Sequence, residues 1–308
     1  MLKGKRKMKI IIIGANSYIA RNLLFVLNDK YLHCEVKLYD RAEIHADKAD
    51  NYFSVNVLDK RSVQNIDFIC DIVFMFTGKT GSIDGFDDYD TFIDVNEKAL
   101  LNILNEYKKQ RSTAKIVFPS TRLVYKGRDG MLSENDAKEF KTIYAINKFA
   151  CEQYLKQYQR VFGVKYCIFR ICIPYGTLVP NASSYGTAEF MLNKAQNGNN
   201  ISLYGDGSVR RTITYMGDLC TLMIEGAFSE KCENDVFNIY GEDYSLKEMA
   251  ELIAEKYNVK VEFVKWPNIA EKIESGNTVF DGSKLRRILH IENRMKFSNW
   301  IEGMGVDA

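Results

Sequence analysis

The sequence predicts an α/β protein built on a parallel sheet that helices cover on both faces. Strand-like and helix-like segments alternate along the chain, and the strand-like segments are continuous apolar runs, as expected of strands buried on both faces. The helix-like segments carry apolar residues at the spacing of one helix face. A glycine, Gly14, follows the first apolar run directly and provides the turn from strand to helix.

The expected elements follow from this alternation. The strands are residues 9–13, 36–39, 72–76, 115–118, 166–171 and 236–240, and the helices are residues 17–28, 91–110, 143–162 and 188–196. The alternation breaks after Gly176, where the chain becomes loop-rich before the helix at 188. We therefore expect two domains, residues 1–175 and residues 176–308, with the strand at 236–240 returning to the sheet of the first domain.

The composition is that of an ordinary globular protein. The 308 residues are 46% hydrophobic and 27% charged, with a formal net charge of +2, which gives no basis for a nucleic-acid partner. The apolar run at 10–13 is too short for a signal-peptide core, so we expect the basic segment 1–7 to be an extension ahead of the first strand. No run approaches the roughly 20 apolar residues of a membrane span, and no membrane insertion is expected.

Metal and disulfide chemistry are not expected. The chain has three histidines, which form no ligand-like pair, and seven cysteines, which include no C-x-x-C pair. We interpret the cysteines as small buried thiols of a cytoplasmic protein. They are Cys34, Cys70, Cys151, Cys167, Cys172, Cys220 and Cys232.

The segment 14–20 (GANSYIA) is a candidate phosphate-binding turn. Gly14 can take the tight turn, Ser17 and Ala20 allow close backbone approach, and the following helix presents free N–H groups to a pyrophosphate. Asp40 ends the next strand, where a carboxylate can bind a ribose hydroxyl and disfavours a 2′-phosphate. Asp40 therefore favours NAD, whereas Arg41 beside it keeps NADP open. A turn without any ligand is the competing interpretation.

Tyr144 and Lys148 are the strongest candidates for chemistry. Residues four apart share one face of a helix, so the lysine charge lies near the tyrosine hydroxyl and favours its phenolate. The helix follows a strand that ends at Ser120-Thr121, and ligands bind at the carboxyl ends of parallel strands. A surface Tyr-Lys pair is the competing interpretation, and the position after a dinucleotide-type turn disfavours it.

These segments resemble, in this order, the extended short-chain dehydrogenases/reductases. The matching stretches are 14–20, Asp40, Asn96, 119–125 (PSTRLVY), Tyr144 with Lys148, and 169–176 (FRICIPYG). Residues 204–218 resemble the substrate-domain signature of NAD-dependent nucleotide-sugar epimerases and dehydratases. The resemblance covers Met8 to His290. It implies a Rossmann-type, doubly wound parallel sheet with a smaller C-terminal substrate-binding domain.

The resemblance also implies the site residues. The catalytic set is Thr121, Tyr144 and Lys148. The cofactor, NAD, is expected to contact Gly14, Asn16, Ser17, Tyr18, Ile19, Asp40, Arg41, Asn56, Val57, Phe76, Thr77, Gly78, Asn96, Tyr144, Lys148 and Ile171. The nucleoside-diphosphate sugar is expected to contact Lys79, Thr121, Arg122, Tyr204 and Arg211, with Arg211 on a phosphate. A homodimer is implied, paired through the helices at 91–110 and 143–162.

Two departures from the family pattern bear on the reaction. Ile173 stands where an asparagine often contacts substrate, and Arg122-Leu123 stand where dehydratases carry an acidic pair. A 4,6-dehydration needs an acid and a base to remove water, so a dehydratase is disfavoured. We expect a C4 epimerase of a nucleoside-diphosphate sugar. The alternatives are a reductase of a 4-keto-6-deoxy sugar nucleotide and a non-catalytic dinucleotide-binding protein.

Overall fold

The computed structural model describes residues 7–182 and 186–304. Seven parallel strands form the central sheet, in the order β11-β7-β5-β4-β1-β2-β3. Their bounds are β1 Met8–Ile13, β2 Cys34–Asp40, β3 Tyr52–Ser54, β4 Ile72–Met75, β5 Lys115–Thr121, β7 Lys165–Ile171 and β11 Asp235–Asn238. This confirms the expected parallel α/β fold. The sheet follows from the sequence because β4 and residues 10–13 of β1 are continuous apolar runs that are buried on both faces.

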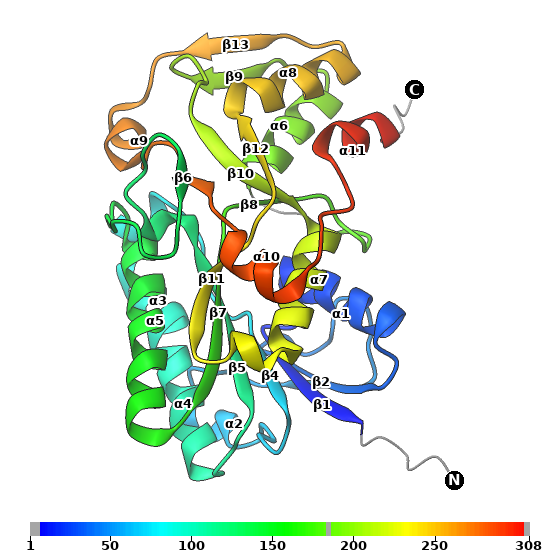
Figure 1. Ribbon diagram of the computed structural model, residues 1–308, viewed down its shortest axis with the longest axis vertical. Coiled ribbons are helices and arrows are strands. Elements are labelled where there is room, and N and C mark those ends of the chain that lie inside the picture. Colours follow the sequence, from blue (N-terminus) through cyan, green and yellow to red (C-terminus); the bar gives the residue numbers. More distant parts are fainter. Residues whose placement is uncertain (1–6, 183–185, 305–308) are drawn as a thin grey trace.

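Helices cover both faces of the sheet (Figure 1). One face carries α1 Tyr18–Lys30, α7 Met216–Phe228 and α10 Ser283–Leu289, and the other carries α2 Lys60–Val63, α4 Ala99–Lys109 and α5 Ile143–Phe162. The side chains between sheet and helices form two cores. Ile10 and Ile12 of β1 lie in one core and Ile11 and Ile13 in the other, as the alternation of side chains along a strand requires.

The remaining elements form a second layered unit at one end of the sheet (Figure 1). Its sheets are β12-β10-β8, β13-β9 and β14-β6. The strands are β6 Met131–Leu132, β8 Ile173–Tyr175, β9 Ile201–Tyr204, β10 Arg210–Tyr215, β12 Glu242–Ser245, β13 Val261–Val264 and β14 Val279–Phe280, with helices α6 Thr187–Gln196, α8 Leu246–Tyr257, α9 Asn268–Ile273 and α11 Phe297–Gly303. A core of its own, including Ile173, Met191 and Ile253, holds this unit together.

The expected strand at 236–240 is β11, at residues 235–238, and it pairs with β7 at the edge of the main sheet. After β7 the chain therefore passes into the second unit at β8, and it returns to the first sheet at β11 before building β12. The apolar run at 115–118 is the first part of β5, which runs on through Pro119 and Ser120 and ends at Thr121, as expected from its position before the Tyr144 helix.

The helix expected at 91–110 is interrupted. The chain forms α3 at Tyr89–Ile93, a wider π-helical turn at Asp94–Lys98, and then α4. Such turns are frequent at functional sites, and this one contains Asn96. The interruption is invisible in the apolar spacing because Val95, Ala99 and Leu100 fit an unbroken helix. The loop expected at 180–186 lies partly outside the described residues, as do residues 1–6 of the basic segment.

Candidate active site

The predicted residues meet at the carboxyl ends of β1, β4 and β5, which are neighbours in the sheet. The turn after β1 holds Gly14, the segment after β4 holds Thr77 to Lys79, and β5 ends at Thr121. Parallel strands present their carboxyl ends at one edge, so residues far apart in the sequence are brought together there.

Gly14 makes the turn from β1 to α1. Its φ is +82°, in the region that favours glycine, and a Cβ there would lie 2.6 Å from the carbonyl carbon of Phe76. Ser17 begins α1 as its N-cap, yet its side chain caps no backbone N–H, and its Oγ is buried without a hydrogen-bond partner among the described residues. No acidic residue lies in the first turn of α1. An unpartnered hydroxyl beside free helix N–H groups fits a phosphate oxygen.

Asp40 ends β2 beside this turn. Its Oδ2 accepts the backbone N–H of Asn16 at 2.9 Å, and its Oδ1 accepts that of Arg41 at 2.7 Å. The Asn16 side chain fixes the adjoining loop through Ile44 O, at 3.2 Å, and Ala46 N, at 2.8 Å. The carboxylate is thus held at the edge of the turn, whereas Arg41 is exposed.

The other predicted residues on this side lie around the same turn. Tyr18 donates its hydroxyl to the carbonyl of Gly176, and its burial raises the pKa of the phenol. Ile19 is half-buried, Val57 is buried, and Asn56 is exposed with its Oδ1 accepting Leu58 N at 3.0 Å. Tyr18 therefore ties the turn to the start of the second unit.

Asn96 holds the segment after β4. Its Oδ1 accepts the N–H of Lys79 at 3.0 Å and its Nδ2 donates to the Lys79 carbonyl at 3.1 Å. A Cβ on Gly78 would lie 3.0 Å from Asn96 Oδ1 and 3.6 Å from Lys148 Nζ, which places this segment against the lysine. Lys79, predicted for substrate, forms an ion pair with Asp88. Phe76 is buried and Thr77 half-buried.

Thr121, Tyr144 and Lys148 lie where the end of β5 meets the first turns of α5. The helix that carries the pair, α5, spans the predicted residues, and the Thr142 hydroxyl caps it by accepting Ala145 N at 3.0 Å. Burial raises the pKa of Tyr144, and a hydrogen bond with Thr121 partly offsets that rise. Thr121, at the end of β5, thus lies beside the first turn of α5, which carries Tyr144.

Lys148 is buried beside these two residues. Its Nζ donates to the carbonyl of Pro119 at 2.8 Å and lies 6.0 Å from the centre of the Tyr144 ring. Burial lowers the pKa of Lys148 to about 8. The lysine is therefore a positioned cation that titrates close to neutral pH, one helical turn from the tyrosine.

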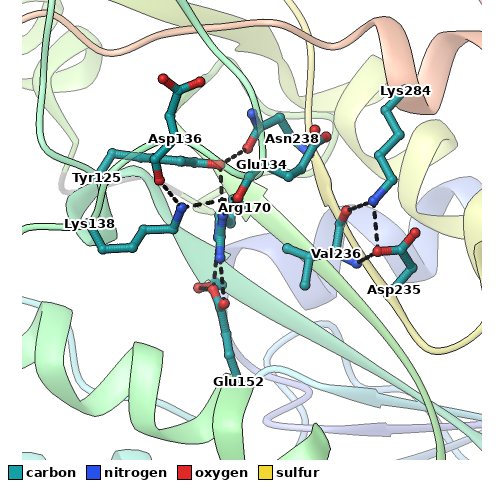
Figure 2. Close-up of polar contacts among 11 residues, drawn as sticks. Tyr125, Glu134, Asp136, Lys138, Glu152, Arg170, Asp235, Val236, Asn238 and Lys284 are labelled. Carbon is teal, nitrogen blue, oxygen red and sulfur yellow. Dashed lines mark hydrogen bonds and ion pairs between the residues drawn. The ribbon is translucent and has the colours of Figure 1, made fainter.

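Behind the trio lies a buried polar network that the sequence reasoning missed (Figure 2). Arg170 of β7 donates to both Glu152 oxygens, at 3.0 and 2.6 Å, and to the Tyr125 hydroxyl at 2.8 Å. Glu152 also accepts the Ser120 hydroxyl at 2.5 Å. Tyr125 in turn donates to Asn238 of β11 at 2.6 Å. The network thus ties together β5, α5, β7 and β11.

A signal for this network was present in the sequence. Glu152 follows Lys148 by four residues and Tyr144 by eight, so all three lie on one helix face. Lys138 lies beside the network, with its Nζ 4.6 Å from the centre of the Tyr125 ring (Figure 2). Burial and the Arg170 charge lower the pKa of Lys138 to about 8.

Arg211 is buried in the second unit, with 1% of its surface exposed. Its Nη1 donates to the carbonyls of Arg210, at 2.9 Å, and Gly276, at 2.5 Å, and its Nη2 pairs with Glu274. The predicted phosphate-binding fork is therefore covered by a carboxylate of the chain itself. Arg122 lies near it and donates to Ser275 Oγ at 2.9 Å.

The remaining predicted residues are dispersed. Ile171 is buried at the end of β7, and Ile173 packs in the core of the second unit. Tyr204 is exposed at the end of β9, with its ring centre 5.2 Å from that of Trp266. Among the described residues, no helix is both long and apolar enough to cross a membrane, and no three His, Cys, Asp or Glu side chains are grouped to hold a metal ion.

The chain is similar in sequence to curated enzymes that act on nucleotide sugars. The chain is 33% identical to the dTDP-4-dehydro-6-deoxyglucose reductase of Escherichia coli over 153 residues, which cover 47% of this chain and 46% of that one. It is 24% identical to the CDP-paratose 2-epimerase of Salmonella typhi over 226 residues, 65% of this chain and 67% of that one. The chain spans about half the length of the first curated relatives it matches.

Solved structures share the fold. The UDP-glucose 4-epimerase of Thermus thermophilus in complex with NAD superposes with a TM-score of 0.83 over 96% of each chain, at 21% identity. The NAD dependent epimerase/dehydratase family matches residues 10–240, which contain the glycine turn, Asp40, the Thr121–Tyr144–Lys148 set and Arg211. The chain therefore belongs to the NAD dependent epimerase/dehydratase family.

Proposed function

We propose that the protein is an NAD-dependent redox enzyme acting at C4 of a nucleoside-diphosphate sugar, and that it is a C4 epimerase. The observation that carries the proposal is the convergence of Thr121, Tyr144 and Lys148 at the carboxyl end of β5, beside the turn of Gly14. Hydride exchange at an alcohol carbon requires an acid/base at its oxygen, and Tyr144 with Thr121 provides one.

Tyr144 exchanges the proton of the reacting hydroxyl. The pKa of its phenol is raised by burial, so positive charge is needed to make the phenolate accessible, and Lys148 supplies it from the same helix face. The Thr121 hydroxyl hydrogen-bonds the tyrosine and orients the sugar oxygen. Pro119 O fixes the lysine, so the charge is placed before substrate arrives.

The cofactor site fits NAD. The unpartnered Ser17 Oγ and the N-terminus of α1 suit the pyrophosphate, and Asp40 at the edge of the turn suits the adenosine ribose. When bound, NAD accepts a hydride from the sugar carbon and can return it. Asn96 acts here through the backbone it clamps at Lys79, so we propose it as a positioning residue for the cofactor edge of the site.

The structure gives no support for dehydration. Arg122, directly after Thr121, is a cation whose pKa is lowered to about 10 by burial and by Arg211, so it remains protonated at neutral pH. A guanidinium cannot act as the base that removes a sugar C5 proton, nor readily as the acid that protonates the leaving hydroxyl.

A reductase of a 4-keto sugar nucleotide is the second candidate. The 33% identity to a dTDP-4-dehydro-6-deoxyglucose reductase favours it, and the same Tyr144 serves as the proton donor. The reactions differ in the fate of the cofactor, because an epimerase regenerates NAD within each turnover, whereas a reductase must release the oxidised cofactor it forms and bind fresh NADH or NADPH.

Two measurements on the purified protein separate these candidates. The first is cofactor retention through gel filtration, read by absorbance of the released nucleotide. The second is turnover with UDP-glucose, UDP-galactose and a dTDP-4-keto-6-deoxy sugar, with and without added NADH. Interconversion of the first two without added cofactor supports the epimerase. Stoichiometric NADH consumption with the keto sugar alone supports the reductase, and inactivity on every substrate contradicts both.

We also propose a cytoplasmic homodimer. The described cysteines are all free thiols, as a reducing compartment allows. The helices α3 and α5 carry exposed apolar side chains, including Tyr89 (53% exposed), Ile93 (43%) and Ile146 (47%). Light scattering should give a dimer that Ile146→Glu dissociates. Phe190→Glu, at a 55% exposed position on α6, is the matched control and should leave the dimer intact.

A further inference from the structure

Residues 274–277, the strap, join α9 to β14 and lie across two arginines. Arg211 donates to Glu274 Oε1 at 2.5 Å and to the carbonyl of Gly276 at 2.5 Å. Arg122 donates to Ser275 Oγ at 2.9 Å. The two guanidiniums, from β10 and from the turn after β5, are thus held by successive residues of one short segment.

The backbone of the strap is fixed from the other side. Gly127 N donates to Ser275 O at 2.8 Å, and Lys141 Nζ donates to Glu274 O at 2.8 Å. A Cβ on Gly127 would lie 1.9 Å from Ser275 O, so only glycine permits this approach. The Glu274 side chain is 23% exposed, whereas that of Arg211 is 2% exposed. The carboxylate is the outer member of the pair. Its Oε1 also accepts the N–H of Gly276 at 2.9 Å, so rotation of the side chain breaks that bond as well, while the backbone carbonyl of Glu274 stays bound to Lys141.

The charges around the strap do not balance. Two guanidiniums face one carboxylate, and among the described residues Arg122 forms no ion pair. Burial first, and then repulsion from Arg211, lower the pKa of Arg122 to about 10. A half-buried cation without a counter-ion is unfavourable unless a ligand supplies one. An anion with two charged groups would match both guanidiniums, whereas Glu274 matches one.

We propose that Arg122 and Arg211 form one anion-binding subsite, in which the Glu274 carboxylate occupies the place of the substrate diphosphate and is displaced when the nucleotide sugar binds. This rests on the proposed function, which gives the site a nucleoside-diphosphate substrate. Each phosphoryl group then faces one guanidinium, in the bidentate geometry that arginine favours. Ser275 releases Arg122 with the loss of a single hydrogen bond, from the guanidinium to an uncharged hydroxyl.

The exchange gives Glu274 a role in specificity. A ligand must carry more negative charge than the single Glu274 carboxylate to displace it from the arginines. A diphosphate can therefore displace Glu274, whereas a monophosphate or a free carboxylate competes poorly. Glu274 therefore lowers the affinity for every anion, and most of all for the weaker ones. The strap selects diphosphates by holding a competing charge in their place.

Calorimetric titration of the purified protein, with its retained cofactor, tests the exchange. The probes are UDP, dTDP, CDP and UMP at fixed ionic strength. Glu274→Gln keeps an oxygen for Arg211 but removes the competing charge, so we expect the preferred diphosphate to bind about tenfold tighter. The affinity of Glu274→Gln for UMP should rise by at least the same factor, so this variant should prefer diphosphates over the monophosphate no more strongly than the wild type does, or less strongly. Arg122→Gln should weaken diphosphate binding by about tenfold.

Asp243→Asn is the matched control. Asp243 Oδ1 lies 2.9 Å from Nε of Arg210, so this change removes a carboxylate from an arginine next to Arg211 but outside the subsite. It should change affinity by less than about twofold. Thermal melting checks that each variant is folded. The Arg122→Gln measurement does not depend on Glu274, so it still tests the two-arginine subsite if Glu274→Gln fails to fold.

The outcomes separate the two proposals. Wild-type binding with no gain in folded Glu274→Gln, or no loss in Arg122→Gln, would refute the exchange and leave the proposed function intact. Wild-type protein that binds none of the nucleoside diphosphates would refute the nucleotide-sugar function itself, and the exchange with it.

Discussion

Lys148 Nζ donates a hydrogen bond to the carbonyl of Pro119, two residues before Thr121 on β5. This bond crosses from helix α5 to the strand and fixes the lysine charge relative to the threonine hydroxyl. The three proposed catalytic side chains are therefore held by one strand and one helix, which are rigid elements, rather than by loops.

Replacing Tyr144 by Phe removes one hydroxyl and should abolish most of the chemistry. Turnover should fall by roughly 10²–10⁴, the usual share of general acid–base catalysis, with folding and NAD binding nearly unchanged. Thr121→Ala should cost less, and Thr121→Ser should be nearly silent because the hydroxyl is retained. The measurement is single-turnover absorbance of the reduced nicotinamide. Wild-type hydride transfer in Tyr144→Phe, at normal cofactor occupancy, would exclude this residue from the mechanism.

The alkaline limb of the pH–rate profile should report Lys148. Its pKa is lowered to about 8, so it carries its charge below pH 8 and loses it above. Turnover should therefore decline above about pH 8 as the support for the phenolate is lost. Lys148→Arg should lower the rate but remove this limb, because arginine stays protonated.

Lys138 provides the control for that assignment. Its pKa is also lowered to about 8, but it lies over the Tyr125 ring beside the buried network. Lys138→Met should leave the alkaline limb in place. A limb that disappears in Lys138→Met and persists in Lys148→Arg would reverse the assignment.

The Glu152–Arg170 pair should contribute to stability as a unit. Both side chains are buried, so Glu152→Gln leaves the guanidinium without its counter-ion and should cost about 3–5 kcal/mol in the free energy of unfolding. Replacing both by methionine should cost less than the sum of the single changes. Asp67→Asn, which breaks the half-exposed pair with Lys37, is the control and should cost under about 1 kcal/mol. Urea denaturation measures each of these variants together with the single changes Glu152→Met and Arg170→Met, and strict additivity of the two methionine changes would contradict the coupling.

Asp40 should set the preference for NAD. Asp40→Ala should weaken NAD by about 1.5–3 kcal/mol, because a charge-assisted hydrogen bond to the ribose is lost. Part of the loss of NAD affinity would come from disturbance of the turn itself, since Asp40 also accepts the backbone N–H groups of Asn16 and Arg41. Asp40→Asn keeps acceptor capacity for those bonds and separates the two effects. Calorimetry with NAD and NADP is decisive, and tighter NADP binding by the wild type would show that Arg41 dominates.

The sequence predicted the parts of the site that depend on local spacing. Tyr144 and Lys148 are four residues apart on a helix, so the predicted bounds of α5 were correct and the pair faces one way. The glycine turn follows equally from its place between β1 and α1. The comparisons confirm the family and the fold, whereas the roles of the individual residues remain proposals.

Features that depend on contacts between distant segments were not predictable. The Arg211 guanidinium was expected to face a phosphate, but it pairs with Glu274, 63 positions further along the chain. Nothing in the local sequence of either residue indicates that pairing. The π-helical turn at Asp94–Lys98 was hidden for a related reason, since the apolar spacing on both sides fits an unbroken helix. In the structure, this turn carries Asn96, whose side chain bonds the backbone N–H and carbonyl of Lys79.

The return of β11 to the edge of the main sheet has a consequence for how the chain can be divided. A fragment ending near residue 176 would contain six of the seven strands and would leave β7 as an unpaired edge, with its backbone groups open to other chains. It would also lose Asn238, the acceptor for the Tyr125 hydroxyl. We therefore expect residues 1–176 alone to fold poorly, and truncation at this point to yield aggregates.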